Sequence, residues 1–326
     1  MERSALVLGA TGGIGGAVAR RLLASGWTVR ALVRPGSMSR LPTGVRAVVG
    51  DALSAEAVTR AAAGAELIVH AVNPPGYRDW STWVLPMIDN TIGAARTGGA
   101  RVLLPGTVYN YGQDAFPMID EAAPQHPATR KGAIRVELER RLRDAADAGG
   151  ISVLIVRAGD FFGPNAGNNW FSQGLVKPGR RPRVIHNPGR PGVGHQWAYL
   201  PDVAETMVRL VDHGELDRFA TFHMDGHWDA DGTHITDMIV RTLGDPAVPV
   251  RRLPWWAIRI GGLFASTPRE LLEMRYLWEQ PVRMSNHRLV ATIGKEPHTP
   301  LEDAVRATLI DMGCLVDGDV RPEPRT

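Results

Sequence analysis

A short apolar run that ends in a glycine-rich turn and leads straight into a helical pattern limits this fold more than any other segment. Ala5–Leu8 is apolar, residues 9–15 read Gly-Ala-Thr-Gly-Gly-Ile-Gly, and apolar residues recur at helical spacing from Ile14 to Ala24. Glycines permit a tight turn and a close approach of backbone to phosphate, and a helix start offers N–H groups to an anion. The sequence therefore predicts a phosphate-binding strand–turn–helix unit.

Strand and helix patterns alternate through the first half of the chain. Apolar runs bounded by turn residues predict further strands at 28–33, 46–49, 66–71, 101–104 and 152–156. Helical spacing predicts helices at 55–63, 85–95 and 135–148. Fully apolar strands separated by helices are typical of a parallel sheet that is covered on both faces. We therefore expect an α/β fold with a doubly wound parallel sheet.

The composition and periodicity of the sequence change after Arg157. Residues 163–195 are rich in Gly, Pro, Asn and Arg and show little periodicity. A helix at 203–211 and a strand at 219–224 follow, and helical patterns and loops dominate the remainder. Six of the nine tryptophans lie after residue 150, as expected for a smaller lobe that packs over a cleft.

Composition and charge exclude several classes of protein. The 37 basic and 34 acidic residues are mixed along the chain and leave a net charge of +3, which argues against nucleic-acid or membrane-surface binding. Cys314 is the single cysteine, so an internal disulfide or a cysteine-rich zinc site is excluded, and we read it as a core residue. No metal-ligand spacing such as HExxH occurs, and no apolar run reaches the roughly 20 residues of a membrane span. We expect a cytoplasmic protein without metal.

The end of the second predicted strand bears on the type of dinucleotide. An acidic residue there would accept hydrogen bonds from the ribose 2′-hydroxyl of NAD, whereas an arginine suits the 2′-phosphate of NADP. Arg34 occupies the position and favours NADP over NAD, with Ser37 and Arg40 as candidate helpers, although a solvated strand-end arginine is the alternative. Asp51, after the third strand, could face the adenine or simply start a turn.

Further motifs follow the glycine turn in a fixed order. They are residues 50–53 (GDAL), 107–112 (TVYNYG), 157–164 (RAGDFFGP), 199–204 (YLPDVA) and 289–309, which contains GKEP and PLE. Together these motifs resemble those of the extended short-chain dehydrogenase/reductases, the NAD-dependent epimerase/dehydratase group, over nearly the whole chain.

The resemblance implies a Rossmann domain that binds a nicotinamide cofactor and a discontinuous second domain that closes over the substrate, often a nucleotide sugar. We expect residues 1–162 and about 196–226 in the first domain, and residues 163–195 and 227–326 in the second. The predicted cofactor contacts are Gly9, Thr11, Gly12, Gly13, Ile14, Gly15, Arg34, Asp51, Ala52, Ala71, Val72, Asn73 and Arg135.

The catalytic positions depart from the family pattern. The resemblance implies a Ser or Thr after the fifth strand, which is Thr107, and then a Tyr-x-x-x-Lys whose tyrosine transfers a proton and whose lysine holds the nicotinamide ribose. The same register places Lys131 and Arg135 at these two positions, and no tyrosine occurs between residues 112 and 198. A buried lysine with a lowered pKa could donate a proton, whereas arginine keeps its charge and could only hold hydroxyls or phosphate.

Several assignments at this centre stay open. Lys131 could instead be a solvated surface residue, and Tyr109 and Tyr111 are alternative acids that could also simply pack in their loop. The substrate residues implied by the resemblance are Asp160, Asn168, Asn169, Trp170, His195 and Gln196. The two asparagines suit hydroxyl or phosphate recognition but equally suit a turn after Gly167.

Two hypotheses of function remain at this point. The first is an NAD(P)-dependent oxidoreductase or epimerase/dehydratase-like enzyme that transfers hydride to or from a small carbonyl, hydroxyl or nucleotide-sugar substrate with an unconventional acid. The second is a non-catalytic NAD(P)-binding redox sensor or partner-binding module. The charged helix at 131–148 is either a homodimer face or a solvated surface.

Overall fold

A seven-stranded parallel sheet forms the centre of the computed structural model, which describes residues 3–74, 80–167, 169–262 and 266–316. The strand order is β11-β7-β5-β4-β1-β2-β3. The bounds are β1 Ser4–Leu8, β2 Thr28–Val33, β3 Arg46–Val49, β4 Leu67–His70, β5 Arg101–Gly106, β7 Ser152–Arg157 and β11 Phe219–His223. The order reverses between β1 and β4, and ligands of such sheets bind outside the carboxyl ends of the strands at this point.

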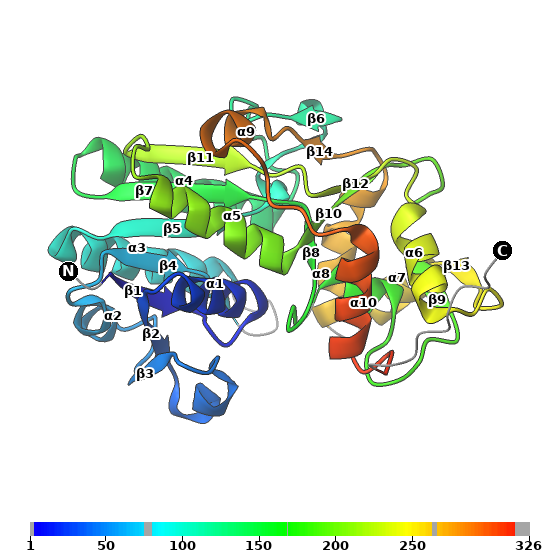
Figure 1. The fold of residues 1–326 in the computed structure, drawn as a ribbon. Helices are drawn as coiled ribbons and strands as arrows, with labels where there is room; N and C mark the ends of the chain where they lie inside the picture. Colours follow the sequence, from blue (N-terminus) through cyan, green and yellow to red (C-terminus); the bar gives the residue numbers. More distant parts are fainter. Residues whose placement is uncertain (1–2, 75–79, 168, 263–265, 317–326) are drawn as a thin grey trace.

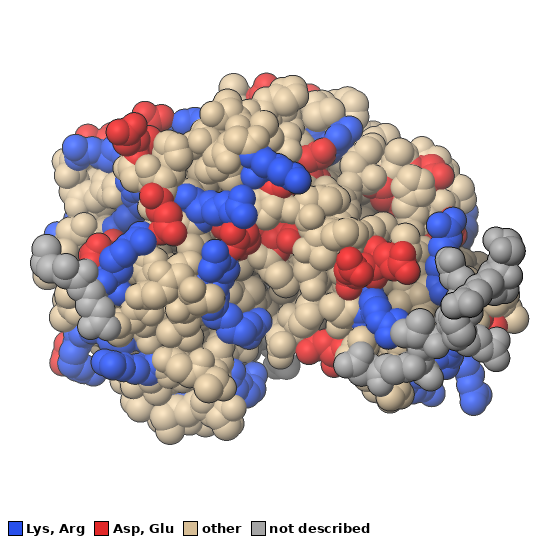
Figure 2. Space-filling view, viewed as in Figure 1, with Lys and Arg blue, Asp and Glu red and all other residues tan. Residues whose placement is uncertain are grey.

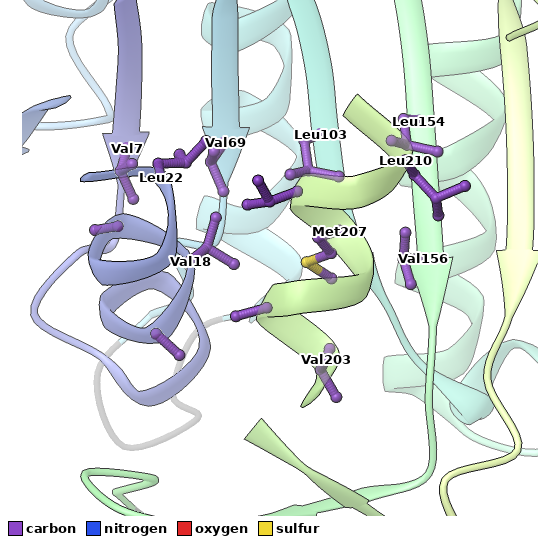
Figure 3. Packing of buried hydrophobic residues seen from close by; sticks show 14 of the residues in the cluster. Val7, Val18, Leu22, Val69, Leu103, Leu154, Val156, Val203, Met207 and Leu210 are labelled. Atoms are coloured by element: carbon purple, nitrogen blue, oxygen red, sulfur yellow. The ribbon is translucent and has the colours of Figure 1, made fainter. Parts of the chain in front are cut away.

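Helices cover both faces of this sheet (Figure 1). Their bounds are α1 Gly13–Ala24, α2 Ala55–Ala62, α3 Trp80–Gly98, α4 Arg130–Asp147 and α5 Leu200–His213. Helices α1 and α5 share one buried apolar cluster with the sheet, and α2, α3 and α4 share another on the opposite face. Figure 3 shows Val18 and Leu22 of α1 and Met207 of α5 packed over the apolar side chains of the strands. The doubly wound Rossmann-type fold is thus confirmed.

A second lobe lies to the right of the sheet in Figure 1 and has a core of its own, rich in aromatic side chains. Its three-stranded sheet has the order β12-β10-β8, with β8 Asp160–Phe162, β10 His195–Tyr199 and β12 His227–Asp229. Two small ladders add β9 Ile185–Asn187 with β13 Val250–Arg252, and β6 Met118–Ile119 with β14 Arg283–Met284. The remaining helices are α6 His234–Leu243, α7 Trp255–Gly261, α8 Ser266–Glu273, α9 His287–Ile293 and α10 Leu301–Asp311.

Helix α9 departs from the simple division of the chain into two halves. Leu289 of α9 is fully buried in the apolar cluster that α1 and α5 share with the central sheet. Residues late in the sequence therefore complete the packing of the first lobe. The domain boundaries given above stay a prediction.

Local sequence patterns place most elements of the central sheet correctly. The ranges predicted for β2 and β3 coincide with those observed, and that for β1 differs by one residue. Helix α4 begins at Arg130, five residues before the start that helical spacing predicts at Arg135, because the Thr129 side chain accepts a hydrogen bond from the Gly132 N–H and caps the helix. The three-residue strands of the second lobe lie in segments without a clear period and were not predicted.

Cationic and anionic side chains are interspersed on the face drawn in Figure 2, in agreement with the mixed charges along the sequence. Among the described residues, no helix is both long and apolar enough to cross a bilayer.

Candidate functional site

Two glycines of the turn between β1 and α1, Gly9 and Gly15, have no room for a side chain. A Cβ at Gly9, whose φ is +90°, would lie 2.4 Å from the Ala71 carbonyl oxygen, and one at Gly15 would lie 2.3 Å from the Gly9 carbonyl oxygen. Helix α1 begins after Gly12 with no side-chain cap and no acidic residue in its first turn. Its first N–H groups and the positive end of its dipole are therefore suited to bind an anion.

This turn forms one wall of a cleft of about 850 Å³. The carboxyl ends of β1, β2, β4 and β5 contribute further walls, α3 adds Trp80, Trp83 and Met87, and the segment after β7 adds Phe161, Ala166 and Gly167. The cleft is large enough for a dinucleotide and opens at the switch point of the sheet. The predicted cofactor residues that line it are Gly9, Thr11, Gly12, Gly13, Ile14, Arg34, Asp51, Ala52, Ala71, Val72, Asn73 and Arg135.

Two arginines lie at the end of the cleft formed by β2 and β3. Arg34 is exposed at the end of β2, and Arg40 donates a hydrogen bond of 3.0 Å to the Ser37 hydroxyl. All three residues line the cleft. The Asp51 carboxylate also lines it, but one of its oxygens accepts the Leu53 N–H at 3.0 Å and so closes a local turn. This end can hold a phosphate that carries two negative charges.

Thr107, Tyr109 and Arg135 line the cleft at its opposite end. The Arg135 guanidinium donates to Asn73 Oδ1 at 3.0 Å and lies 5.2 Å from the centroid of the Trp80 ring. Lys131 is buried, and its ammonium lies 5.7 Å from the same ring, although Lys131 itself does not line the cleft. The structure thus brings Lys131 and Arg135, the residues predicted at the two catalytic positions, to one tryptophan of the cleft wall.

Glu273, at the carboxyl end of α8, contacts the N-terminus of α4. Its Oε1 accepts the Lys131 backbone N–H at 3.2 Å. A carboxylate at a helix N-terminus is favoured by the helix dipole. The second lobe therefore contacts α4 directly at Lys131, the residue predicted at the position of the family tyrosine.

Sequence reasoning did not single out His70, the last residue of β4, which lines the floor of the cleft. Its Nδ1 lies 2.8 Å from the Thr91 hydroxyl. Burial, and then the positive charge of Arg135, lower the pKa of His70 to about 3. The imidazole is therefore neutral at physiological pH. Its place at the carboxyl end of a strand was the available sequence signal.

Tyr111 lies behind Thr107, outside the cleft. Its hydroxyl is 3.2 Å from His223 Nε2, and the Arg157 guanidinium lies 5.2 Å from its ring centroid. Burial raises the pKa of Tyr111. Burial, and then the charge of Arg157, lower the pKa of His223 to about 3. The predicted role of Tyr111 as an acid stays untested, and its environment holds the phenol in its neutral form.

A buried ion pair anchors this region. Arg157, fully buried on β7, donates to both carboxylate oxygens of Glu139 on α4, at 3.0 and 2.8 Å, and to the Thr107 carbonyl oxygen at 2.6 Å. Burial opposes the charge of Arg157, yet the Glu139 carboxylate raises the pKa of its guanidinium above the ordinary value. One arginine therefore ties the strand, the helix and the Thr107 loop together.

The predicted substrate residues that are described lie in the second lobe and do not line the cleft. Asp160 Oδ2 lies 2.8 Å from His195 Nε2, and the His195 ring stacks on Trp278 with 3.7 Å between centroids. The Gln196 amide binds the backbone carbonyl oxygens of Met224, Asp225 and Met284, and its oxygen accepts the Met284 N–H. Trp170 packs against Trp255 and Trp278, and Asn169 pairs with Ser172. Asn168 lies outside the described residues.

No group of three or more His, Cys, Asp or Glu side chains among the described residues could hold a metal ion. Cys314 is a buried free thiol whose pKa is raised by burial.

Comparisons with known proteins agree with this geometry. The model of the NAD dependent epimerase/dehydratase family matches residues 5–220. A 3-diazoavenalumate denitrifying reductase from Streptomyces sp. is 33% identical over 182 residues, which are 50% of this chain and 57% of that protein. The chain thus matches somewhat more than half the length of that curated relative.

Solved structures share the fold, and two of them serve as examples. The UDP-glucose 4-epimerase of Thermotoga maritima, solved with UDP-glucose, superposes with a TM-score of 0.73 at 17% identity, over 94% of this chain and 97% of that one. The enzyme WbmH of Bordetella bronchiseptica, solved with NAD+, gives a TM-score of 0.68 at 17% identity, over 95% and 98% of the two chains.

Proposed function

Because the chain belongs to the NAD-dependent epimerase/dehydratase family, we propose that it is an NADP-dependent oxidoreductase that transfers hydride between the cofactor and a small carbonyl or hydroxyl compound. The observation that carries the proposal is the cleft itself. It joins a phosphate-binding glycine turn at its centre to Arg34 at one end and to Thr107, Tyr109 and Arg135 at the other. When bound, the dinucleotide supplies or accepts hydride at its nicotinamide ring.

The glycine turn fits the diphosphate of a dinucleotide. A Cβ at Gly13 would lie 2.5 Å from the Ala166 carbonyl oxygen, so only glycine lets the start of α1 lie this close to the segment that contains Ala166. The uncapped N-terminus of α1 would hold the diphosphate oxygens. Arg34, with Arg40 and Ser37, would hold the 2′-phosphate, which is why we favour NADP over NAD.

The roles at the other end follow from charge and position. Arg135 would hold the nicotinamide ribose, because a guanidinium donates hydrogen bonds but releases no proton near neutral pH. Lys131 or Tyr109 would supply the proton that a carbonyl oxygen takes up on reduction. Thr107 would lie beside the oxygen of the substrate. His70, neutral beneath the cleft, would not compete as a charged acid.

A small substrate is favoured over a nucleotide sugar. The side chains of Asp160, His195 and Gln196 already bind protein partners, and Trp170 and Trp278 fill the space beside them. A nucleotide would have to displace these contacts. The similarity to a reductase at 33% identity supports reduction as the reaction, although the match covers only part of both proteins.

The test begins with binding and then measures turnover. We expect NADPH to bind more tightly than NADH in fluorescence titrations, and turnover on a panel of small ketones, aldehydes and alcohols but not on UDP-glucose. Lys131→Ala should keep NADPH affinity and lower kcat, whereas Arg130→Ala, at the exposed neighbouring position, should change neither. Absence of dinucleotide binding at millimolar concentration would refute the proposal.

A second candidate function rests on the absence of the Tyr-x-x-x-Lys pair. Lys131 and Arg135 occupy its positions, and a protein without the usual acid can bind a dinucleotide and serve as a redox sensor. The sensor would show tight, redox-selective dinucleotide binding and no turnover of the wild-type protein on any member of the panel.

A further inference from the structure

A chain of side-chain hydrogen bonds leads from the cleft into the protein interior. The Thr107 hydroxyl donates to Asn110 Oδ1 at 3.2 Å, and Asn110 Nδ2 donates to Gln125 Oε1 at 3.0 Å. Gln125 Nε2 then donates to Glu139 Oε2 at 3.4 Å. Every donor in this chain points away from the cleft and toward Glu139.

The direction of the chain is fixed at its buried end. Glu139 is held by two hydrogen bonds from the fully buried Arg157, and a carboxylate in such a pair can only accept hydrogen bonds. Gln125 must therefore turn its NH2 group toward Glu139, which leaves its oxygen for Asn110. Asn110 must turn its NH2 group toward that oxygen, which leaves its own oxygen for Thr107.

Asn110 is fully buried, so its oxygen cannot take a hydrogen bond from bulk water. The Thr107 hydroxyl is the donor that it has among the described residues. Turning that hydroxyl toward a ligand would leave the Asn110 oxygen unsatisfied. The resulting penalty is about five- to 150-fold in an equilibrium constant, which is ~1–3 kcal/mol at 1.4 kcal/mol per tenfold.

From this chain we propose that Thr107 offers the cleft a hydrogen-bond acceptor and not a donor, so that the site favours a substrate group that carries its own proton, a hydroxyl. Asn110 and Gln125 are positioning residues that set this polarity through Thr107. The inference rests on the proposed function and specifies which form of the substrate Thr107 binds. The alcohol form donates its hydroxyl proton to Thr107, whereas the carbonyl form needs a hydrogen-bond donor from Lys131 or Tyr109.

Neutron diffraction from a deuterated crystal of the NADP-loaded protein tests the polarity directly. The expected result places the deuterium of the Thr107 hydroxyl on the line to Asn110 Oδ1 and those of the Gln125 amide toward Glu139. A Thr107 deuterium that points into the cleft would overturn the inference. Cofactor density in the same crystal tests the proposed function separately, so the two can fail independently.

The ratio of the affinities for an alcohol and for the matching ketone tests the proposed polarity of Thr107. The probes are 1-phenylethanol and acetophenone, whose aromatic ring suits the tryptophans of the cleft, each titrated with the cofactor form that cannot react with it. Gln125→Met releases Asn110, so the affinity ratio should shift toward the ketone by at least about fivefold. The control is Gln113→Met. Gln113 is exposed and its side chain takes no part in the hydrogen-bond chain from Thr107 to Glu139. A purely structural role of Gln125 would weaken both probes equally and leave the ratio unchanged, which contradicts the inference.

Discussion

Substitution of Glu139 by Gln isolates the buried ion pair behind the candidate site. The change keeps the shape of the side chain but leaves the Arg157 guanidinium, fully buried on β7, without a counter-charge. Removal of one partner of a buried pair costs about 3–5 kcal/mol, against a total stability of about 5–15 kcal/mol for a typical domain. We therefore expect Glu139→Gln to lower the free energy of unfolding by about 3–5 kcal/mol and Tm by at least about 6 °C.

The same helix supplies a matched control. Glu137 also accepts hydrogen bonds from two arginines, Arg140 and Arg141, which lower the pKa of its carboxyl to about 2, but this group lies at the surface. Exposed pairs contribute about 0–1 kcal/mol, so Glu137→Gln should change stability little. Urea unfolding followed by circular dichroism measures both variants.

A double variant separates the effect of the two buried charges from the effect of the volume that their side chains fill. Glu139→Leu combined with Arg157→Met removes both charges, and such apolar replacements are often close to neutral. We expect this variant to be more stable than Glu139→Gln. Equal losses for Glu139→Gln and Glu137→Gln would refute the reasoning, because burial would then make no difference.

Three further predictions concern the cofactor and pH. Arg34→Gln should weaken NADPH binding about 10- to 100-fold and leave NADH binding unchanged, since a charge-assisted hydrogen bond contributes about 1.5–3 kcal/mol. The control is Arg46→Gln, at an exposed position of β3. An equal loss of affinity for both cofactors in Arg34→Gln would contradict the assignment. Gly13→Val should abolish dinucleotide binding because of the Ala166 carbonyl, whereas Gly93→Ala, where no atom lies within 4 Å of the new Cβ, should leave binding intact. The folded-state pKa of His70, about 3, lies below its unfolded value, so the stability it contributes is present above pH 6.5 and is lost as pH falls toward 3. Between pH 7 and 5, the free energy of unfolding of wild type, measured with urea, should therefore fall by about 2 kcal/mol more than that of His70→Asn. If the two proteins lose the same amount over this pH range, His70 titrates normally and the prediction is wrong.

Local patterns sufficed for the central sheet because its strands are apolar runs between turn residues. β2 and β3 could be predicted without knowledge of their neighbours, and the spacing of Gly9, Gly12 and Gly15 marked the turn between β1 and α1. These signals lie within a few residues of one another. The fold class therefore followed from the sequence.

The environments of Tyr111 and Gln196 could not be read in the same way. Tyr111 meets His223, 112 residues later, and Gln196 binds Met284, 88 residues later. Such partners are set by the path of the chain between the lobes, which no local period records. The same holds for the hydrogen-bond chain behind Thr107, because Asn110 and Gln125 carry no motif of their own.

The close approach of Gly13 to Ala166 limits how substrate loops could be exchanged in this scaffold. Two backbones touch there without any side chain between them, so the seam tolerates neither an added methyl group nor a shift of either segment. A designer who grafts foreign loops onto the second lobe would keep residues 163–167 as a fixed splice point. New specificity is better sought downstream, where a changed loop does not press on α1, the helix proposed to hold the phosphates.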